Sequence, residues 1–264
     1  MYTCQNFFHG DNLLLAVIRI LVMALAILLI SICSCLYCLF RPFHRNNVFH
    51  AARYMGRVSK LLGLDVEVRV PESVRQLDSV VFICNHQNSY DIFTVSNAVL
   101  PGTVSVGKKS LKWIPFFGQM YWLTGNILID RKNTNKAMNT IESTAKKIKE
   151  KKLSVWLFPE GTRSYGRGLL PFKTGAFRTA QKAGVPIVPI CASNIHKKID
   201  LNRWDNGKMI IEVLEPIDVV HVEKEKIREL VNETRGKMLN KIIELNEETG
   251  HPFEPNLNMN SEKS

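Results

Sequence analysis

The longest apolar segment of the chain lies near its beginning. Residues 13–40 are almost entirely apolar, and Arg19 is the one charged residue among them. As a helix the segment would be about 40 Å long, which exceeds the roughly 30 Å hydrocarbon core of a bilayer. A cleaved signal peptide has a shorter apolar core behind basic residues, and no Lys or Arg precedes Arg19. The pattern predicts a retained, membrane-embedded helix.

A second helix, amphipathic in pattern, is predicted over residues 46–62. Such a helix either lies in the lipid headgroup layer or packs on its own domain, and the sequence leaves both arrangements open. It also allows the segment 13–40 to span the bilayer or to form a hairpin with this helix within one leaflet. The apolar side consists of Val48, Ala51, Ala52, Met55, Val58 and Leu62, and the opposite side carries His50, Arg53, Arg57 and Lys60.

The chain after this N-terminal region (residues 1–62) alternates β-type runs with helical patterns. Residues 63–249 are therefore expected to form one α/β domain, with a mixed, largely parallel sheet flanked by helices. Residues 250–264 are polar and are expected to form a flexible tail. Strands are predicted at 64–70, 79–84, 103–107, 126–130, 153–158, 185–191 and 208–214, and helices near 89–99, 133–151, 174–183 and 222–247.

Charge adds a preference for anionic partners. The 264 residues carry a net charge of +11, and Asp11 and Arg19 cancel within the first forty, so the excess belongs to residues 41–264. Nucleic acid, an anionic bilayer surface, phosphorylated substrates and acidic carrier proteins all fit such a domain. Because basic residues follow the apolar segment and none precedes it, the positive-inside rule places the domain in the cytoplasm. These residues are Arg41, Arg45, Arg53, Arg57 and Lys60.

The six cysteines suggest neither a disulfide framework nor a metal site. Four of them lie in or before the apolar segment, and the other two, Cys84 and Cys191, are far apart. Cys35 and Cys38 have the spacing of half a zinc site, but no second pair of ligands follows at a suitable distance. We therefore expect no bound metal.

The first candidate for chemistry is the segment NHQNSYD, residues 85–91, directly after the predicted strand 79–84. A helix would place His86 and Asp91 about 140° apart, so only a bent loop can bring them together. With Asn88 or Ser89 as the helix cap, Asp91 would lie in the first turn of the next helix. A carboxylate on one imidazole nitrogen fixes the tautomer and leaves the other nitrogen as a general base. In isolation, this spacing is more often structural.

Two further polar segments follow predicted strands. In FPEGTRS, residues 158–164, Pro159 and Gly161 predict a turn that aims Glu160 and Arg163 outward from the sheet edge. Arg suits phosphate and Glu suits hydroxyl groups, although a surface ion pair is the simpler interpretation. Residues 107–118 add a basic, aromatic segment that could be only a solvated loop. The motifs G-x-S-x-G, Walker A, H-E-x-x-H and G-x-G-x-x-G are absent, so a substrate hydroxyl is the simplest nucleophile.

Together, NHQNSYD, KKSLKWIPFFGQ, FPEGTRS and VPIVPI (residues 185–190) resemble the 1-acylglycerol-3-phosphate acyltransferase family, especially its short bacterial members. The leading apolar segment is part of the likeness. The resemblance implies that residues 185–190 support the acyl site. It also implies a role for six individual residues: His86 as base, Asp91 as its partner, Lys108 and Arg163 as ligands of the acceptor phosphate, and Glu160 and Gly161 as walls of the acceptor pocket.

The resemblance further implies acyl transfer from a thioester, acyl-CoA or acyl carrier protein, to the 2-hydroxyl of lysophosphatidic acid. The product would be phosphatidic acid, a step of phospholipid biosynthesis that requires no cofactor. The enzyme would act at the inner membrane, with its domain on the cytoplasmic side and without nucleic acid. Acylation of glycerol 3-phosphate or another lysophospholipid is the near alternative. A hydrolase using the same dyad, and a non-catalytic membrane-tethered binder of nucleic acid or lipid surfaces, are alternatives from other classes.

Overall fold

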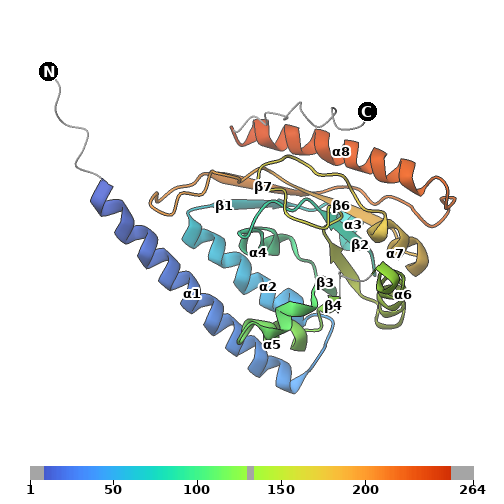
Figure 1. The fold of residues 1–264 in the computed structure, drawn as a ribbon, viewed down its shortest axis with the longest axis horizontal. Helices are drawn as coiled ribbons and strands as arrows, with labels where there is room; N and C mark the ends of the chain where they lie inside the picture. Colours follow the sequence, from blue (N-terminus) through green and yellow to red (C-terminus); the bar gives the residue numbers. More distant parts are fainter. Residues whose placement is uncertain (1–8, 130–133, 251–264) are drawn as a thin grey trace.

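A seven-stranded mixed sheet forms the centre of the computed structural model, which describes residues 9–129 and 134–250 (Figure 1). The strand order is β1-β7-β6-β2-β5-β3-β4. Five neighbouring strands, β6 to β4 in this order, are parallel, whereas β7 pairs antiparallel with β6 and carries β1 beside it. The strands are β1 (Asp65–Arg69), β2 (Val81–Cys84), β3 (Thr103–Lys108), β4 (Ile127–Ile129), β5 (Ser154–Leu157), β6 (Ile187–Ala192) and β7 (Lys208–Val213).

Helices cover both faces of the sheet, as the alternating side chains of its strands require. Val81 and Ile83 of β2 pack toward α6 (Thr134–Lys151), α7 (Gly175–Ala183) and α8 (Ile227–Glu248). Phe82 and Cys84 face the other way, toward α3 (Glu72–Arg75) and the 3₁₀ helix η2 (Val95–Ala98). The predicted α/β class with a mixed, largely parallel sheet is confirmed. The predicted tail lies outside the described residues except for Gly250.

The amphipathic segment packs on its own domain. It forms α2 (Asn47–Arg57) and the 3₁₀ helix η1 (Val58–Leu62), and all six residues of the predicted apolar side are buried. Four of them, Ala51, Met55, Val58 and Leu62, join a core with Met23 of α1 (His9–Phe40) and with α4 (Asp91–Thr94) and α5 (Phe117–Leu123). Arg53, Arg57 and Lys60 are exposed. Of the two arrangements that the sequence left open, the structure therefore has the packed helix.

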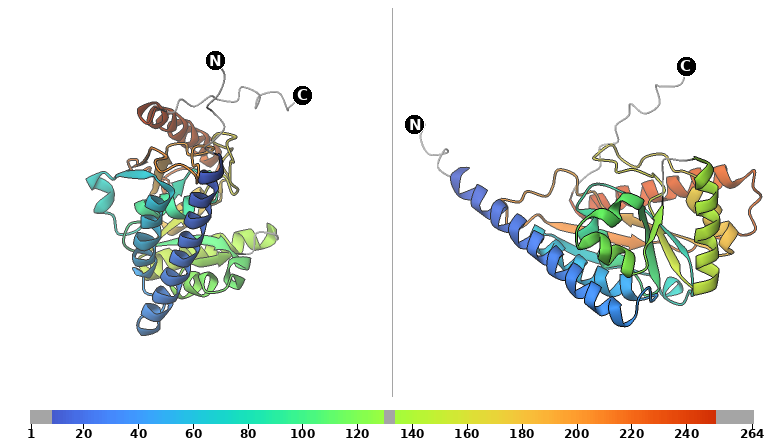
Figure 2. Two further views of the ribbon diagram at one scale, coloured as in Figure 1. Left: turned by 90° about the vertical axis from the view of Figure 1, so that its left-hand side faces the viewer. Right: turned by 60° about the horizontal axis from the view of Figure 1, so that its bottom comes forward.

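Helix α1 lies beside α2 along one side of the domain and leaves most of its own surface uncovered (Figure 2). The most apolar 18-residue stretch of residues 13–40 has a mean hydropathy of 3.1, and 11% of it is buried. The outward leucines include Leu14, Leu21 and Leu29, each more than half exposed. An uncovered apolar surface of this length is what a membrane-embedded helix requires.

One charged residue of α1, Arg19, is buried against the domain. Its guanidinium donates hydrogen bonds to the main-chain oxygens of Leu201 (3.1 Å), Arg203 (2.5 Å) and Trp204 (3.1 Å). The same group lies over the Trp204 ring, 5.3 Å from its centroid. These contacts satisfy the charge that interrupts the apolar segment, and they fasten the first half of α1 to the loop before β7.

Replacing Arg19 by Met should free this loop, because Met keeps a long, unbranched side chain and removes all three hydrogen bonds. Hydrogen bonds to a charged group contribute about 1.5–3 kcal/mol each, so we expect trypsin to cleave after Arg203 at least about tenfold faster. Limited proteolysis followed by mass spectrometry measures the rate. Arg53→Met, on the exposed side of α2, is the control. Equal cleavage of the wild type and the Arg19 variant would contradict the proposed fastening.

Candidate active site

The three polar segments meet at one edge of the sheet. Strands β2, β5 and β3 are parallel neighbours, with Ile83 opposite Leu157 and Ser105 opposite Trp156. Their carboxyl ends therefore lie side by side, where ligands bind in open α/β sheets. NHQNSYD follows β2, FPEGTRS follows the end of β5, and Lys108 is the last residue of β3.

His86 and Asp91 form the predicted pair. The Nδ1 atom of His86 lies 2.6 Å from Oδ2 of Asp91. The side chain of Asp91 is 3% exposed and that of His86 is 19% exposed, so the acid is buried and the imidazole reaches the surface. Within the described part of the chain, His86 Nε2 makes no hydrogen bond. The pair is thus arranged as an oriented general base with one nitrogen available.

A bent loop joins the pair, as predicted, but the predicted cap is wrong. Helix α4 begins at Asp91 behind Tyr90, and no side chain caps it. Instead, Oδ1 of Asn88 accepts a hydrogen bond from the Tyr90 amide at 2.8 Å. Asp91 turns back on the loop, and its Oδ2 accepts from the amides of Gln87 (2.7 Å) and Asn88 (3.3 Å) as well as contacting His86. Two backbone donors therefore hold the carboxylate that orients the base.

The imidazole rests on an aromatic ring. His86 stacks on Phe158, with ring centroids 3.9 Å apart and planes 15° from parallel. Phe158 comes directly after β5, so the strand beside β2 supplies the surface on which the base lies. Phe158 was not identifiable from the sequence, because an apolar residue at the end of a strand is indistinguishable from a core residue.

Glu160 does not point outward, which corrects the prediction. It is 3% exposed. One carboxylate oxygen accepts a hydrogen bond from the backbone N–H of His86 at 2.7 Å, and the other accepts from that of Leu170 at 3.0 Å. Burial raises the pKa of Glu160 to about 7, and the two hydrogen bonds act in the opposite direction. The carboxylate therefore binds the chain itself.

Gly161 makes the turn that brings Glu160 inward. Its φ is +71°, a conformation that favours glycine, and its N–H donates to the Phe158 oxygen at 3.0 Å. A Cβ here would lie 2.9 Å from Nζ of Lys173. The backbone conformation thus requires glycine, whereas the flexible end of the Lys173 side chain can move away from a Cβ. The sequence indicated the turn but gave no sign of this lysine.

Arg163 points outward, as predicted. It is partly exposed and its Nη1 donates to Ser89 Oγ (3.2 Å) and to the Tyr165 hydroxyl (3.1 Å). No carboxylate lies within ion-pair distance of Arg163 or Lys108 in residues 9–129 and 134–250, so the predicted surface ion pair with Glu160 is absent. Lys108 and its neighbour Lys109 are both exposed. Cationic groups are therefore available at the edge where the base lies.

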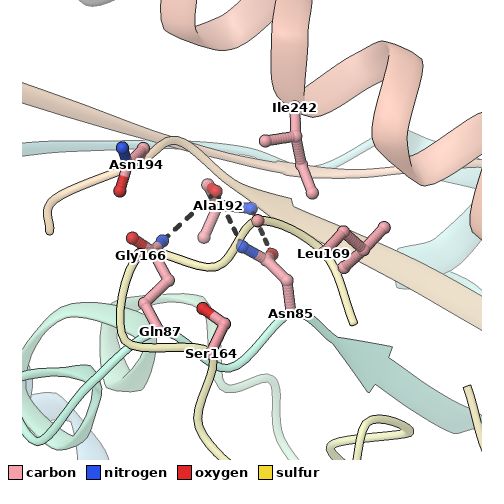
Figure 3. Close-up of a pocket in the computed structure, with 9 residues that line it drawn as sticks. Asn85, Gln87, Ser164, Gly166, Leu169, Ala192, Asn194 and Ile242 are labelled. Carbon is pink, nitrogen blue, oxygen red and sulfur yellow. Dashed lines mark hydrogen bonds between the residues drawn. The ribbon is translucent and has the colours of Figure 1, made fainter. Parts of the chain in front are cut away.

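Two residues that the sequence analysis passed over hold this edge to β6 (Figure 3). The side chain of Asn85 binds both the N–H (2.9 Å) and the oxygen (3.0 Å) of Ala192. The Gln87 side chain donates to the oxygen of Ser193 and accepts from the amide of Ile195, each at 2.8 Å. The alternation of an extended chain was the available signal, since it turns residues 85 and 87 away from the side that His86 faces.

The pocket whose lining residues are drawn in Figure 3 is not large enough for a lipid. Its volume is about 30 Å³, and Asn85, Gln87 and Ser164 are among its lining residues. This is room for a water molecule or two rather than for an acyl chain. Among the residues that the structure describes, no three His, Cys, Asp or Glu side chains form a group that could bind a metal.

Comparisons with known proteins give the relationships of the chain. A sequence model of the Acyltransferase family matches residues 65–193, which include His86, Asp91, Lys108, Glu160, Gly161 and Arg163. The 1-acyl-sn-glycerol-3-phosphate acyltransferase of Haemophilus influenzae is 50% identical over 89% of this chain and 98% of its own length. The enzyme of that name from Escherichia coli is 49% identical over 89% of this chain and 96% of its own.

The fold is also that of a solved relative. The crystal structure of the 1-acyl-sn-glycerophosphate acyltransferase from Thermotoga maritima superposes with a TM-score of 0.67, covering 88% of this chain and 97% of that one at 24% identity. A likeness at this identity supports the architecture alone, whereas half-identical relatives matched over nearly their full length establish descent. The chain belongs to the 1-acyl-sn-glycerol-3-phosphate acyltransferase family.

Proposed function

We propose that this protein transfers a fatty acyl group from an acyl thioester to the 2-hydroxyl of 1-acylglycerol 3-phosphate, which yields phosphatidic acid and a free thiol. The donor is acyl-CoA or an acylated carrier protein. The observation that carries the proposal is the pair of His86 and Asp91, whose Nδ1–Oδ2 distance of 2.6 Å leaves Nε2 available at the sheet edge. The names of the half-identical relatives support the choice of substrate.

In the mechanism, Nε2 of His86 accepts the proton of the acceptor hydroxyl as the oxygen attacks the thioester carbonyl carbon. The tetrahedral intermediate then expels the thiolate, which takes the proton from the imidazolium. Asp91 holds the ring in the tautomer that presents Nε2 and stabilises the transient positive charge. Since a thiolate is a good leaving group, both substrates can react while bound together, without an acyl-enzyme.

Lys108 and Arg163 are our candidates for the phosphate of the acceptor. Both lie at the edge where β2, β5 and β3 end, both are accessible, and neither is neutralised by a carboxylate of the described chain. The planar guanidinium of Arg163 can bind two phosphate oxygens, whereas Lys108 supplies a point charge. Together they would hold the headgroup while the hydroxyl meets His86.

We further propose that α1 lies within one leaflet, on the cytoplasmic side of the inner membrane, rather than spanning it. Arg19 and Arg41 are about 33 Å apart along the chain at helical rise, which is the thickness of the hydrocarbon core. The domain contacts α1 near both positions, through the loop at Leu201 and through α2 and α5. If α1 spanned the bilayer, polar parts of the domain would lie in the hydrocarbon core, which carries a large cost in free energy. The exposed basic residues of α2 favour an anionic leaflet.

The proposed activity is tested with purified protein, labelled acyl-CoA or acyl carrier protein, and a panel of acceptors. We expect labelled phosphatidic acid with lysophosphatidic acid, and little product with glycerol 3-phosphate or other lysophospholipids. His86→Ala should lower kcat by about 10²–10⁴-fold, because the general base is lost. Asp91→Asn should also lower kcat, because it favours the wrong tautomer. Free fatty acid formed without an acceptor would instead indicate a hydrolase, and near-normal turnover by His86→Ala would refute the mechanism.

Arg163→Ala should act on the acceptor. Loss of a charge-assisted phosphate contact of about 1.5–3 kcal/mol should raise the KM for lysophosphatidic acid by at least about tenfold and leave the KM for acyl-CoA unchanged. Steady-state kinetics with each substrate varied in turn measures both constants. Arg178→Ala, exposed on α7, is the matched control. A raised KM for the thioester would move Arg163 to the donor side.

The side on which the N-terminus lies tests the membrane arrangement. A protease site fused before Met1 should be cleaved in vesicles that carry the domain on their outer surface, because a one-leaflet helix returns its start to the same side. A spanning α1 would protect the site until detergent opens the vesicles. Gel mobility before and after detergent separates the two outcomes, and protection would contradict the one-leaflet arrangement.

A further inference from the structure

The main chain of His86 is held by a segment that comes after a different strand. Its N–H donates to the carboxylate of Glu160 at 2.7 Å, and its C=O accepts from the amide of Ser164 at 2.8 Å. The next residue, Gln87, continues the pattern, since its oxygen accepts from the Tyr165 amide at 2.9 Å. Both polar groups of the His86 backbone are therefore bound by residues 160–164.

From this geometry we propose that Glu160 is a positioning residue that holds His86 in place through the backbone, and that it does not bind the acceptor. The inference deepens the proposed function and rests on it. The side chain is 3% exposed, so no lysolipid headgroup can reach it without rearrangement. Both carboxylate oxygens already accept a backbone N–H, one from His86 and one from Leu170.

Arg235 holds the backbone segment that binds the second oxygen of the Glu160 carboxylate. Arg235 of α8 donates through Nε to the oxygen of Leu170 at 3.1 Å and through Nη2 to the oxygen of Leu169. This orients the amide of Leu170 toward Glu160, and the charge of Arg235 favours the ionised carboxylate. The position of His86 is thereby linked to a helix on one face of the sheet, through Glu160 and Leu170.

An ionised carboxylate suits this role because it is an acceptor at both oxygens. A carboxamide of the same size accepts at one atom and donates at the other. In Glu160→Gln the NH₂ group would therefore face the backbone N–H of either His86 or Leu170, and two donors would meet. The backbone of His86 would then shift, and a displacement of about 1 Å at a reacting group lowers turnover by about 10²-fold.

The test is a double-mutant cycle with labelled acyl-CoA and lysophosphatidic acid in mixed micelles. We expect Glu160→Gln to lower kcat by about 10–100-fold and to leave the KM for lysophosphatidic acid within about twofold. In protein that already carries His86→Ala, the same change should lower the residual rate no further, because a residue that acts through His86 has nothing left to position. A raised KM with unchanged kcat, or losses that multiply in the double variant, would overturn the inference.

Glu212→Gln on β7 is the control, since this partly buried carboxylate lies in ion pairs with Lys241 (3.1 Å) and Arg69 (3.5 Å) away from the site. It should reproduce any general loss of thermal stability without the loss of kcat. If Glu160→Gln does not fold, Glu160→Asp, which keeps the charge on a shorter side chain, completes the same cycle with the same two criteria. Failure of the wild type to form phosphatidic acid with both acyl-CoA and acylated carrier protein would refute the proposed function itself, a result distinct from either pattern in the variants.

Discussion

The hydrogen bond between His86 and the buried Asp91 is the interaction on which the rest of the site depends. One oxygen of this carboxylate, Oδ2, contacts the imidazole and accepts from two loop amides, so the loop is shaped around the buried acid. Phe158 covers one face of the imidazole, and Glu160 and Ser164 hold its backbone. The pair is local in sequence, but its support comes from the segment after β5 and from β6.

Much of the fold was predictable from residues 64–249, because strand and helix periods differ and each segment keeps one period. The predicted strands and the longer helices are present within a few residues of their expected bounds. The antiparallel placement of β7 was not predictable, since its buried residues Met209, Ile210 and Ile211 form an apolar run typical of either direction. Whether α1 spans the bilayer was also not predictable, because length and hydropathy do not show the contacts that Arg19 makes with the domain.

Candidate residues were easier to identify than to orient. His86, Asp91 and Arg163 lie where the spacing and turn chemistry placed them, at one edge of the sheet. Glu160 does not, because a turn with positive φ at Gly161 reverses the chain and carries the side chain inward. Asn85 and Gln87 were passed over since buried amides act on partners more than a hundred residues away. Partners so distant in the chain cannot be identified from the local sequence.

The fastening of α1 by Arg19 also bears on how the protein is made. The first partner of Arg19 along the chain, Leu201, is 182 residues away. At ordinary rates of translation a gap of this size corresponds to roughly 10–40 s, during which the arginine has emerged and its acceptors do not yet exist. Lipid or a chaperone must therefore cover the apolar helix during this time. The docking of Arg19 is a late step, which follows the synthesis of β6 and of the loop after it.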